Sequence, residues 1–466
     1  MIRTVLAAAA LLLPLPVHAQ TQQVALEGRY DRALAAGYKA LMLCGAIANA
    51  EASGAKRTPE SVAQWELAGI QQPLDGIVQS LPFNIVRRPT GQIAHVAVTW
   101  ADDMPPRIAA YFGTDTGCSI LPIGAPEDAS NADAPMPVEE GVVENLDLAL
   151  GVMPSPQPDL PPIEAAFANK YGNGRTTAVV VRQVEDGNAK ANYTKFARGF
   201  DKYTPQRTWS VAKSIAATLI GAAVHQGEAS VDDPIGINYW VSGGVSDPRN
   251  AITIDHALRM ATGRYSDTPG NRTDPLYFGG STVDETALNW PVIHKPGTVF
   301  RYANNDTLIA VKAIGQWLTF YPPHEFFDKL GMKATVAETD IRGEYVLSSQ
   351  VWSTAWDLAA FGQLYLNDGV WNGERILPEG WVRYVSAPSG PQPPTGTFGY
   401  GAGFWLLNKE QGVPPDTFAA IGNRGQYVVI VPSRQVVIVR RGEDPAGSGF
   451  DIAAFTRDIL AALDSR

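Results

Sequence analysis

From residue 208 the chain reads Thr208-Trp209-Ser210-Val211-Ala212-Lys213-Ser214-Ile215-Ala216-Ala217-Thr218-Leu219-Ile220-Gly221. In an α-helix, residues i and i+3 share a face, so Ser210 and Lys213 would lie side by side. A serine hydroxyl is a weak nucleophile until a neighbouring base takes its proton. A lysine amine can be that base when burial lowers its pKa toward neutrality. The apolar residues after Lys213 predict a buried helix, which would supply this desolvation.

The Ser-x-x-Lys pattern alone is not specific, because it also occurs at Ser53-Gly54-Ala55-Lys56. That copy lies in a polar stretch ending at Pro59 and has no apolar helix behind it. We interpret Ser53 as a loop residue. The interpretation of Ser210 therefore depends on motifs that follow it in the chain.

The second motif is Tyr302-Ala303-Asn304, and the same pattern at Tyr171 and Tyr365 shows that it too is weak in isolation. A tyrosinate is plausible beside a lysine ammonium, because opposite charge lowers the pKa of a phenol. Tyr302 could then accept the serine proton and return it to the leaving group. Asn304 could donate to a substrate carbonyl and accept from Lys213. The alternative is a buried tyrosine whose hydroxyl is merely hydrogen-bonded.

The third motif, Asn423-Arg424-Gly425, stands just before an apolar strand that begins at Gln426. A small residue at position 425 would let substrate approach the strand closely, which makes residues 423 to 425 candidates for substrate binding. The backbone N–H of Gln426 could pair with that of Ser210 as an oxyanion hole. The alternative is a plain turn glycine before a strand.

Strand patterns lie both before the serine helix and at the end of the chain. Residues 177–185 are rich in valine, and β-branched runs at 426–431 and 436–440 flank a hairpin turn. The last stretch, 452–463, has apolar residues at helical spacing. This order predicts an α+β fold in which an antiparallel sheet, assembled from both ends of the domain, is flanked by helices.

The N-terminus has the pattern of a secretory signal peptide over residues 1–19. Arg3 is followed by an apolar run and by Val17-His18-Ala19, a small-residue ending typical of a cleavage site. The alternative is a membrane helix, but the apolar run is too short to span a bilayer. We therefore expect a secreted or periplasmic protein without a stable membrane span.

Residues 20–150 predict an appended N-terminal α+β domain of unknown role. Its patterns indicate helices at 29–50 and 60–68 and strands at 93–100 and 108–112. A Pro- and acid-rich segment follows, and we place the linker at 151–165 and the main domain at 166–466.

The chain has two cysteines, Cys44 and Cys118. In an oxidising compartment such a pair predicts a disulfide, with two unpaired buried thiols as the alternative. No histidine pair has metal-ligand spacing, so we expect neither a catalytic metal nor a cofactor. The net charge of −10 argues against nucleic acid as a partner.

The three motifs occur in the order found in the penicillin-recognising serine hydrolases, and the chain resembles that superfamily over about residues 165–466. It is most similar to the branch of class C β-lactamases, short-chain esterases and 6-aminohexanoate-dimer hydrolases. The resemblance implies a β-lactamase/transpeptidase-like fold with an added helical domain. It also implies that Ser210 is acylated, that Lys213 and Tyr302 move protons, and that Asn304 orients Lys213 and substrate.

The third motif departs from the family pattern, in which β-lactamases usually carry Lys-Thr-Gly. Here Asn423 replaces the cation, and loss of a fixed positive charge weakens recognition of a β-lactam carboxylate. We therefore expect an exported serine hydrolase, a carboxylesterase or amidase that cleaves small esters or linear amides. The alternatives are a β-lactamase or D-amino peptidase on the same fold, and a catalytically silent protein that binds cell-wall peptides.

Overall fold

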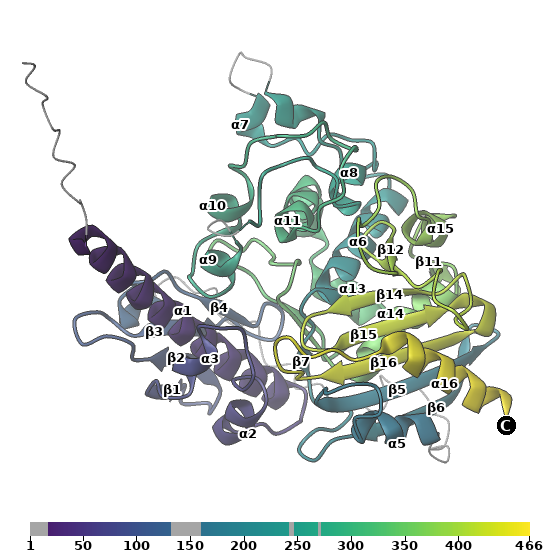
Figure 1. The fold of residues 1–466 in the computed structure, drawn as a ribbon, viewed down its shortest axis with the longest axis horizontal. Helices are drawn as coiled ribbons and strands as arrows, with labels where there is room; N and C mark the ends of the chain where they lie inside the picture. Colours follow the sequence, from purple (N-terminus) through teal and green to yellow (C-terminus); the bar gives the residue numbers. More distant parts are fainter. Residues whose placement is uncertain (1–16, 132–159, 242–246, 269–271) are drawn as a thin grey trace, which may run out of the picture.

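The computed structural model describes residues 17–131, 160–241, 247–268 and 272–466 (Figure 1). The architecture is α+β, as predicted: a seven-stranded sheet, helices around it, and an N-terminal unit with its own sheet. Most of the predicted signal peptide and most of the predicted linker lie outside the described residues.

The central sheet is antiparallel and combines strands from both ends of the main domain, which confirms the predicted assembly. Its order is β12-β13-β14-β15-β16-β5-β6, so the C-terminal strand β16 pairs with the early strand β5. The strands are β5 (Thr176–Glu185), β6 (Asn188–Phe196), β12 (Gly399–Tyr400), β13 (Trp405–Leu406), β14 (Phe418–Gly422), β15 (Gln426–Val431) and β16 (Val436–Gly442).

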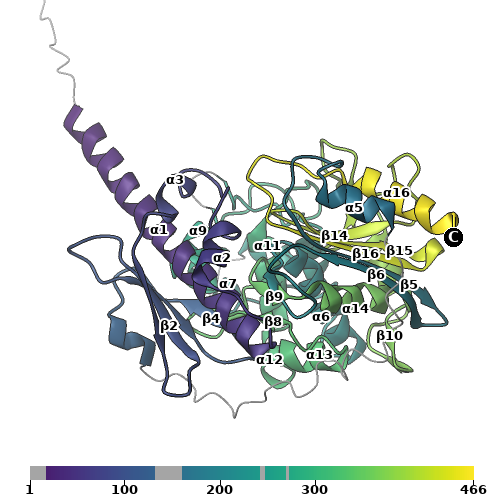
Figure 2. The ribbon, with the colours of Figure 1, turned by 90° about the horizontal axis from the view of Figure 1, so that it is seen from below.

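Helices cover both faces of this sheet (Figures 1 and 2). On one face, α6 (Val211–His225) and α14 (Ala355–Leu366) pack on β-branched residues such as Val428 and Ile430. On the other, α5 (Pro161–Phe167) and α16 (Ile452–Asp464) pack with Val429 and Val431. Successive residues of β15 thus enter opposite layers, which explains why the strand is continuously apolar from Val428 to Val431.

Between α6 and α14 in the chain lies a region of short helices, drawn at the top of Figure 1. Its helices are α7 (Asn238–Val241), α8 (Ile254–Leu258), α9 (Asp274–Tyr277), α10 (Val283–Ala287), α11 (Asn304–Ala313), α12 (Gly315–Phe320) and α13 (Pro323–Lys329). A small sheet has the strand order β7-β9-β8. Its strands are β7 (Gln206–Arg207), β8 (Val336–Ala337) and β9 (Val351–Ser353). The main domain also contains β10 (Val370–Trp371), β11 (Glu374–Arg375) and α15 (Trp381–Ser386).

The N-terminal unit consists of one long helix lying on a four-stranded antiparallel sheet. Its elements are α1 (Val17–Ala52), α2 (Pro59–Gln64), α3 (Asp75–Val78), β1 (Phe83–Arg87), β2 (Ile93–Val98), β3 (Arg107–Tyr111) and β4 (Cys118–Ile120). The predicted disulfide is confirmed, since Cys44 on α1 is bonded to Cys118 on β4.

The N-terminal unit shares one continuous hydrophobic core with the main domain. Side chains of α1 and of β2 to β4 belong to the same buried cluster as those of α6 and α14. Helix α1 passes so close to the main domain that a Cβ on Gly45 would lie 2.5 Å from the Trp352 ring, and one on Gly37 would lie 1.9 Å from the Phe278 carbonyl oxygen. The predicted N-terminal α+β unit is present, and its core is continuous with that of the main domain.

Helix α1 is longer than the sequence pattern indicated, because it begins at Val17 rather than near Arg29. The predicted cleavage point after Ala19 thus falls inside a described helix. Its stretch Thr21–Ala52 is long and apolar enough to cross a membrane, and the apolar window is wholly buried within the protein. Such burial is what a core helix shows. No other helix among the described residues meets the same criterion of length and hydropathy.

Candidate active site

Ser210 stands at the junction between strand β7 and helix α6. The residue before it, Trp209, has a left-handed backbone with φ +51°. This conformation is unfavourable for an L-residue and is held by packing: Trp209 is buried and the Arg207 guanidinium lies 4.2 Å from its ring centroid. The bend brings Ser210 to a partly exposed position, while the residues on either side are buried. The nucleophile candidate is therefore reachable from solvent.

Lys213 lies one helical turn further on and is buried, with 2% exposure. Its Nζ lies 3.0 Å from Ser210 Oγ, 2.7 Å from Asn304 Oδ1 and 2.7 Å from the carbonyl oxygen of Ser348. Burial lowers the pKa of Lys213 to about 7, although the negative charge of Asp267 acts in the opposite direction. The amine is thus substantially uncharged near neutral pH.

The three partners fix how a neutral amine is oriented. A neutral lysine has two N–H groups and one lone pair. The Ser348 carbonyl oxygen can only accept a hydrogen bond, and so can Asn304 Oδ1. The Asn304 amide is oriented in turn by its Nδ2, which donates to Thr273 Oγ1 at 2.8 Å. Because both N–H groups are used in this way, the lone pair of Lys213 points to the Ser210 hydroxyl.

Tyr302 lies just before helix α11 and beside the same pair. The Lys213 Nζ lies 5.1 Å from its ring centroid. Burial raises the pKa of Tyr302 above its ordinary value, and a hydrogen bond with Ser210 opposes this only in part. The tyrosinate expected from a neighbouring ammonium is therefore not favoured, because burial disfavours the charged form of the phenol. Tyr302 carries its proton in the free enzyme.

Asn304 begins α11, and its side-chain amide connects Lys213 to Thr273. One of its two amide hydrogens is used by Thr273, which leaves one for another acceptor. Two partners in this cluster carry no sequence signal. Ser348 acts through a backbone carbonyl that any residue has, and Thr273 belongs to no recognisable motif.

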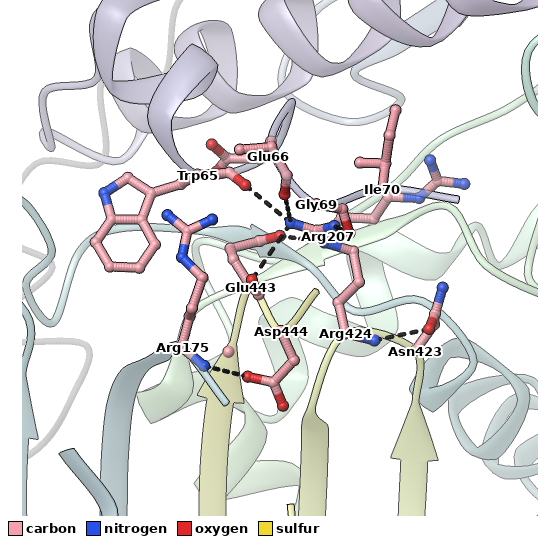
Figure 3. A network of polar contacts seen from close by, with 12 residues as sticks. Trp65, Glu66, Gly69, Ile70, Arg175, Arg207, Asn423, Arg424, Glu443 and Asp444 are labelled. Carbon is pink, nitrogen blue, oxygen red and sulfur yellow. Dashed lines mark hydrogen bonds and ion pairs between the residues drawn. The ribbon is translucent and has the colours of Figure 1, made fainter. Parts of the chain in front are cut away.

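The third motif forms the turn of the β14–β15 hairpin, and only Asn423 of its three residues is exposed. Arg424 is 5% exposed, and its guanidinium points to the N-terminal unit, where it contacts Glu443 and three backbone carbonyls (Figure 3). The prediction that Arg424 binds substrate is therefore wrong: its donors are taken.

Gly425 also differs in role from the prediction. A Cβ at this position would lie 1.8 Å from Arg440 Nη1 and 2.2 Å from Asp444 Oδ2. These two side chains form a buried ion pair at 2.7 Å. Glycine is therefore needed so that the ion pair fits under the turn, rather than so that substrate can approach the strand.

The strand that faces Ser210 is the end of β14. A Cβ on Gly422 would lie 3.1 Å from the Ser210 nitrogen. Gln426, the predicted oxyanion donor, is fully buried and is the register partner of Gly422 across the hairpin. Its N–H thus faces β14 within the ladder.

The alternation of the ladder identifies another donor on β14. Leu407 N donates to the Thr417 carbonyl at 3.0 Å, so Thr417 pairs with β13 through hydrogen bonds. In antiparallel strands every second residue points the same way, which places the N–H groups of Ala419 and Ile421 on that side too. The pairing with β13 ends at Ala419, so the N–H of Ile421 lies beyond the neighbouring strand. The pairing therefore makes the N–H of Ile421, rather than that of Gln426, the candidate oxyanion donor.

Aromatic side chains line the approach to Tyr302. Its ring lies 5.4 Å from that of Trp405 and 6.1 Å from that of Tyr400, and Phe300 packs 5.3 Å from Tyr400. Trp405 and Phe300 are partly exposed. Within the described parts of the chain, no group of three His, Cys, Asp or Glu side chains is placed to hold a metal ion.

Comparison with known proteins agrees with this geometry. The family model described as Beta-lactamase matches residues 164–461. A solved structure described as "Putative 6-aminohexanoate-dimer hydrolase from Bacillus anthracis" is 20% identical, with a TM-score of 0.53 over 65% of this chain and 82% of that one. A "putative beta-lactamase from Bacteroides dorei DSM 17855" is 19% identical, with a TM-score of 0.50 over 66% and 99%. A comparison with curated proteins finds no match. At these identities the solved structures show a shared fold.

Proposed function

The chain belongs to the Beta-lactamase family, and from this premise we propose that it is an exported serine hydrolase that cleaves small esters or linear amides through an acyl-enzyme on Ser210. The observation that carries the proposal is the contact between Ser210 Oγ and a buried Lys213 whose pKa is about 7. Burial of a lysine without a carboxylate partner in contact destabilises its charged form. Such an arrangement suits a general base.

In the acylation step, the Lys213 lone pair takes the Ser210 proton as Oγ attacks the substrate carbonyl. The carbonyl oxygen, now negative, accepts hydrogen bonds from the N–H groups of Ser210 and Ile421, each worth about 3 kcal/mol of barrier. Tyr302 donates its phenol proton to the leaving oxygen or nitrogen, and the Lys213 ammonium replaces that proton. Water then attacks the acyl-enzyme by the reverse sequence.

The proposed substrate class is supported by the charges at the site. Arg424 offers no cation to a substrate carboxylate, because it is buried against the N-terminal unit. The partly exposed rings of Trp405 and Phe300 provide an apolar wall beside Tyr302. These features favour an uncharged acyl group over a β-lactam carboxylate, which such enzymes hold with a fixed positive charge.

Export is supported by the disulfide between Cys44 and Cys118, a bond that persists in oxidising compartments. Residues 1–16, which carry the apolar part of the predicted signal, lie outside the described residues.

A fluorophosphonate probe is expected to label the wild-type protein and not Ser210→Ala. The probe reacts covalently with an activated serine, so labelling, read by intact-protein mass spectrometry, reports the nucleophile directly. Ser53→Ala is the matched control, because Ser53 heads the second Ser-x-x-Lys and lies in a turn where it bonds to the Ala50 and Tyr203 carbonyls. Labelling of Ser210→Ala at the wild-type rate, or no labelling of wild type, would contradict the proposal and favour a silent binding protein.

The substrate class can be tested with p-nitrophenyl acetate, a linear aminohexanoate dimer and nitrocefin in parallel. We expect kcat/KM to be higher for the ester or the linear amide than for nitrocefin. A clear preference for nitrocefin would replace the ester or amide assignment by that of a β-lactamase.

A further inference from the structure

The N-terminal unit touches the candidate site through the turn of the β14–β15 hairpin (Figure 3). Arg424 in this turn sends its guanidinium to the loop of residues 65–69, which follows α2. Its Nη2 donates to the carbonyls of Trp65 at 2.8 Å and Ala68 at 2.9 Å, and its Nη1 to that of Gly69 at 3.1 Å. One side chain of the main domain thus binds three backbone carbonyls of the N-terminal unit.

The three carbonyls belong to turn residues outside any helix or strand, so their oxygens need partners from elsewhere in the fold. Helix α2 ends at Gln64, directly before the loop. The Gly69 carbonyl also accepts from Ala446 N at 2.7 Å, so the loop is held against the main domain at a second point. The loop is therefore a fixed surface on which the hairpin turn rests.

Arg424 adopts a backbone conformation that is rare for its residue type. Its φ is +55°, in the left-handed region that glycine occupies easily and other L-residues do not. If the turn required only its backbone shape, glycine would suit position 424 better. Contacts of the guanidinium must hold the arginine there, because such residues persist where the surroundings over-determine them.

Buried side chains also connect this turn to strand β7, which leads to Ser210. Glu443 accepts from Arg424 Nε at 2.7 Å and from Gln206 Nε2 at 3.5 Å, and Gln206 lies on β7, which leads to Ser210. Arg441 makes a parallel connection, since its Nε donates to Gln426 Oε1 at 2.6 Å and its Nη2 to the Gln206 carbonyl at 2.8 Å. All these side chains are buried.

We propose that Arg424 is a positioning residue: by fixing the hairpin turn on the loop of residues 65–69, it holds the Ile421 N–H at the separation from Ser210 that a substrate oxyanion requires. The N-terminal unit is thus a structural part of the active site. This inference rests on the proposed function, since it assigns a catalytic consequence to the position of β14.

Arg424→Gly is the decisive variant, because glycine keeps the left-handed turn while the guanidinium is lost. We expect kcat for p-nitrophenyl acetate to fall roughly 10- to 100-fold with KM nearly unchanged, as for a displaced transition-state donor. Gly69→Val disturbs the same contact from the side of the loop. A Cβ at position 69 would lie 3.1 Å from Pro445, and the φ of +68° is one that L-residues rarely adopt. This variant should show the same kinetic signature.

Arg175→Ala is the matched control. Arg175 also contacts this part of the N-terminal unit, through the Gln64 carbonyl at 2.5 Å and the Trp65 ring at 4.4 Å, but it stands next to β5 and not in the hairpin. Its loss should lower Tm without lowering kcat. An equal fall of kcat in Arg175→Ala, or an unchanged kcat in Arg424→Gly, would overturn the positioning role.

Hydrogen exchange over residues 418–426 separates this inference from the proposed function, because it needs no substrate. We expect faster exchange in Arg424→Gly and Gly69→Val, and wild-type exchange in Arg175→Ala. Unchanged exchange in Arg424→Gly would overturn the positioning role of Arg424, whatever the kinetic result. If exchange changes as expected but Ser210 does not react, the role of Arg424 in fixing the turn is supported. The hydrolase, and with it any effect of that turn on catalysis, is then rejected.

Discussion

Lys213→Met is expected to lower the rate of Ser210 acylation at least about a thousandfold while the protein stays folded. Methionine has a similar length and fits a buried helix, but it has no lone pair to take the serine proton. The hydrogen-bond partners of the lysine Nζ are the Ser210 hydroxyl, the Asn304 amide and the Ser348 carbonyl, so its removal leaves no counter-charge unpaired in contact. The rate is measured from the p-nitrophenol burst and Tm from calorimetry.

Lys56→Met is the matched control, because Lys56 occupies the corresponding position of the second Ser-x-x-Lys and is exposed. This variant should react at the wild-type rate. A fall of less than about tenfold in Lys213→Met would show that another group acts as the base, since general bases contribute a hundredfold or more.

Deletion of residues 1–150 is expected to abolish the folded, reactive protein. The deletion would expose the faces of Trp352 and Phe278 that α1 covers, and it would leave Arg424 without its three carbonyl partners. Contiguous apolar surface uncovered on this scale causes aggregation or loss of a unique fold. Soluble yield, the thermal unfolding transition and fluorophosphonate labelling of residues 151–466 test the expectation.

Deletion of residues 1–19 is the matched control for the truncation, since residues 21–30 of α1 are exposed. That shorter chain should fold and react. A soluble fragment 151–466 that unfolds in one sharp transition and labels at the wild-type rate would show that the N-terminal unit is dispensable.

The sequence predicted the parts of the fold that depend on local periodicity. The strand 426–431 was expected at the same residues that the structure shows, because β-branched residues alternate between two buried layers. The helix after Ser210 was expected to be buried, and α6 is buried from Val211 to Ala223. The Ser210 and Lys213 pair follows from the i, i+3 geometry of that helix alone.

The features of the site that could not be predicted depend on contacts between segments that are distant in the sequence. Arg424 has the same appearance in sequence whether it faces substrate or the N-terminal unit, and only packing decides between them. The state of Tyr302 was mistaken because burial of the phenol, which the sequence does not reveal, raises its pKa. Ser348 contributes a backbone carbonyl, which no residue type reveals.

The pH dependence of Ser210 acylation tests the role of Lys213 most directly. A base is active when unprotonated, so the burst rate of the wild-type protein with p-nitrophenyl acetate should rise with pH through about 7 and then level off. This plateau should be absent in Lys213→Met. A wild-type rate that keeps rising toward the ordinary lysine pKa of 10.5, without a plateau near neutrality, would contradict the proposal that an uncharged lysine activates the serine.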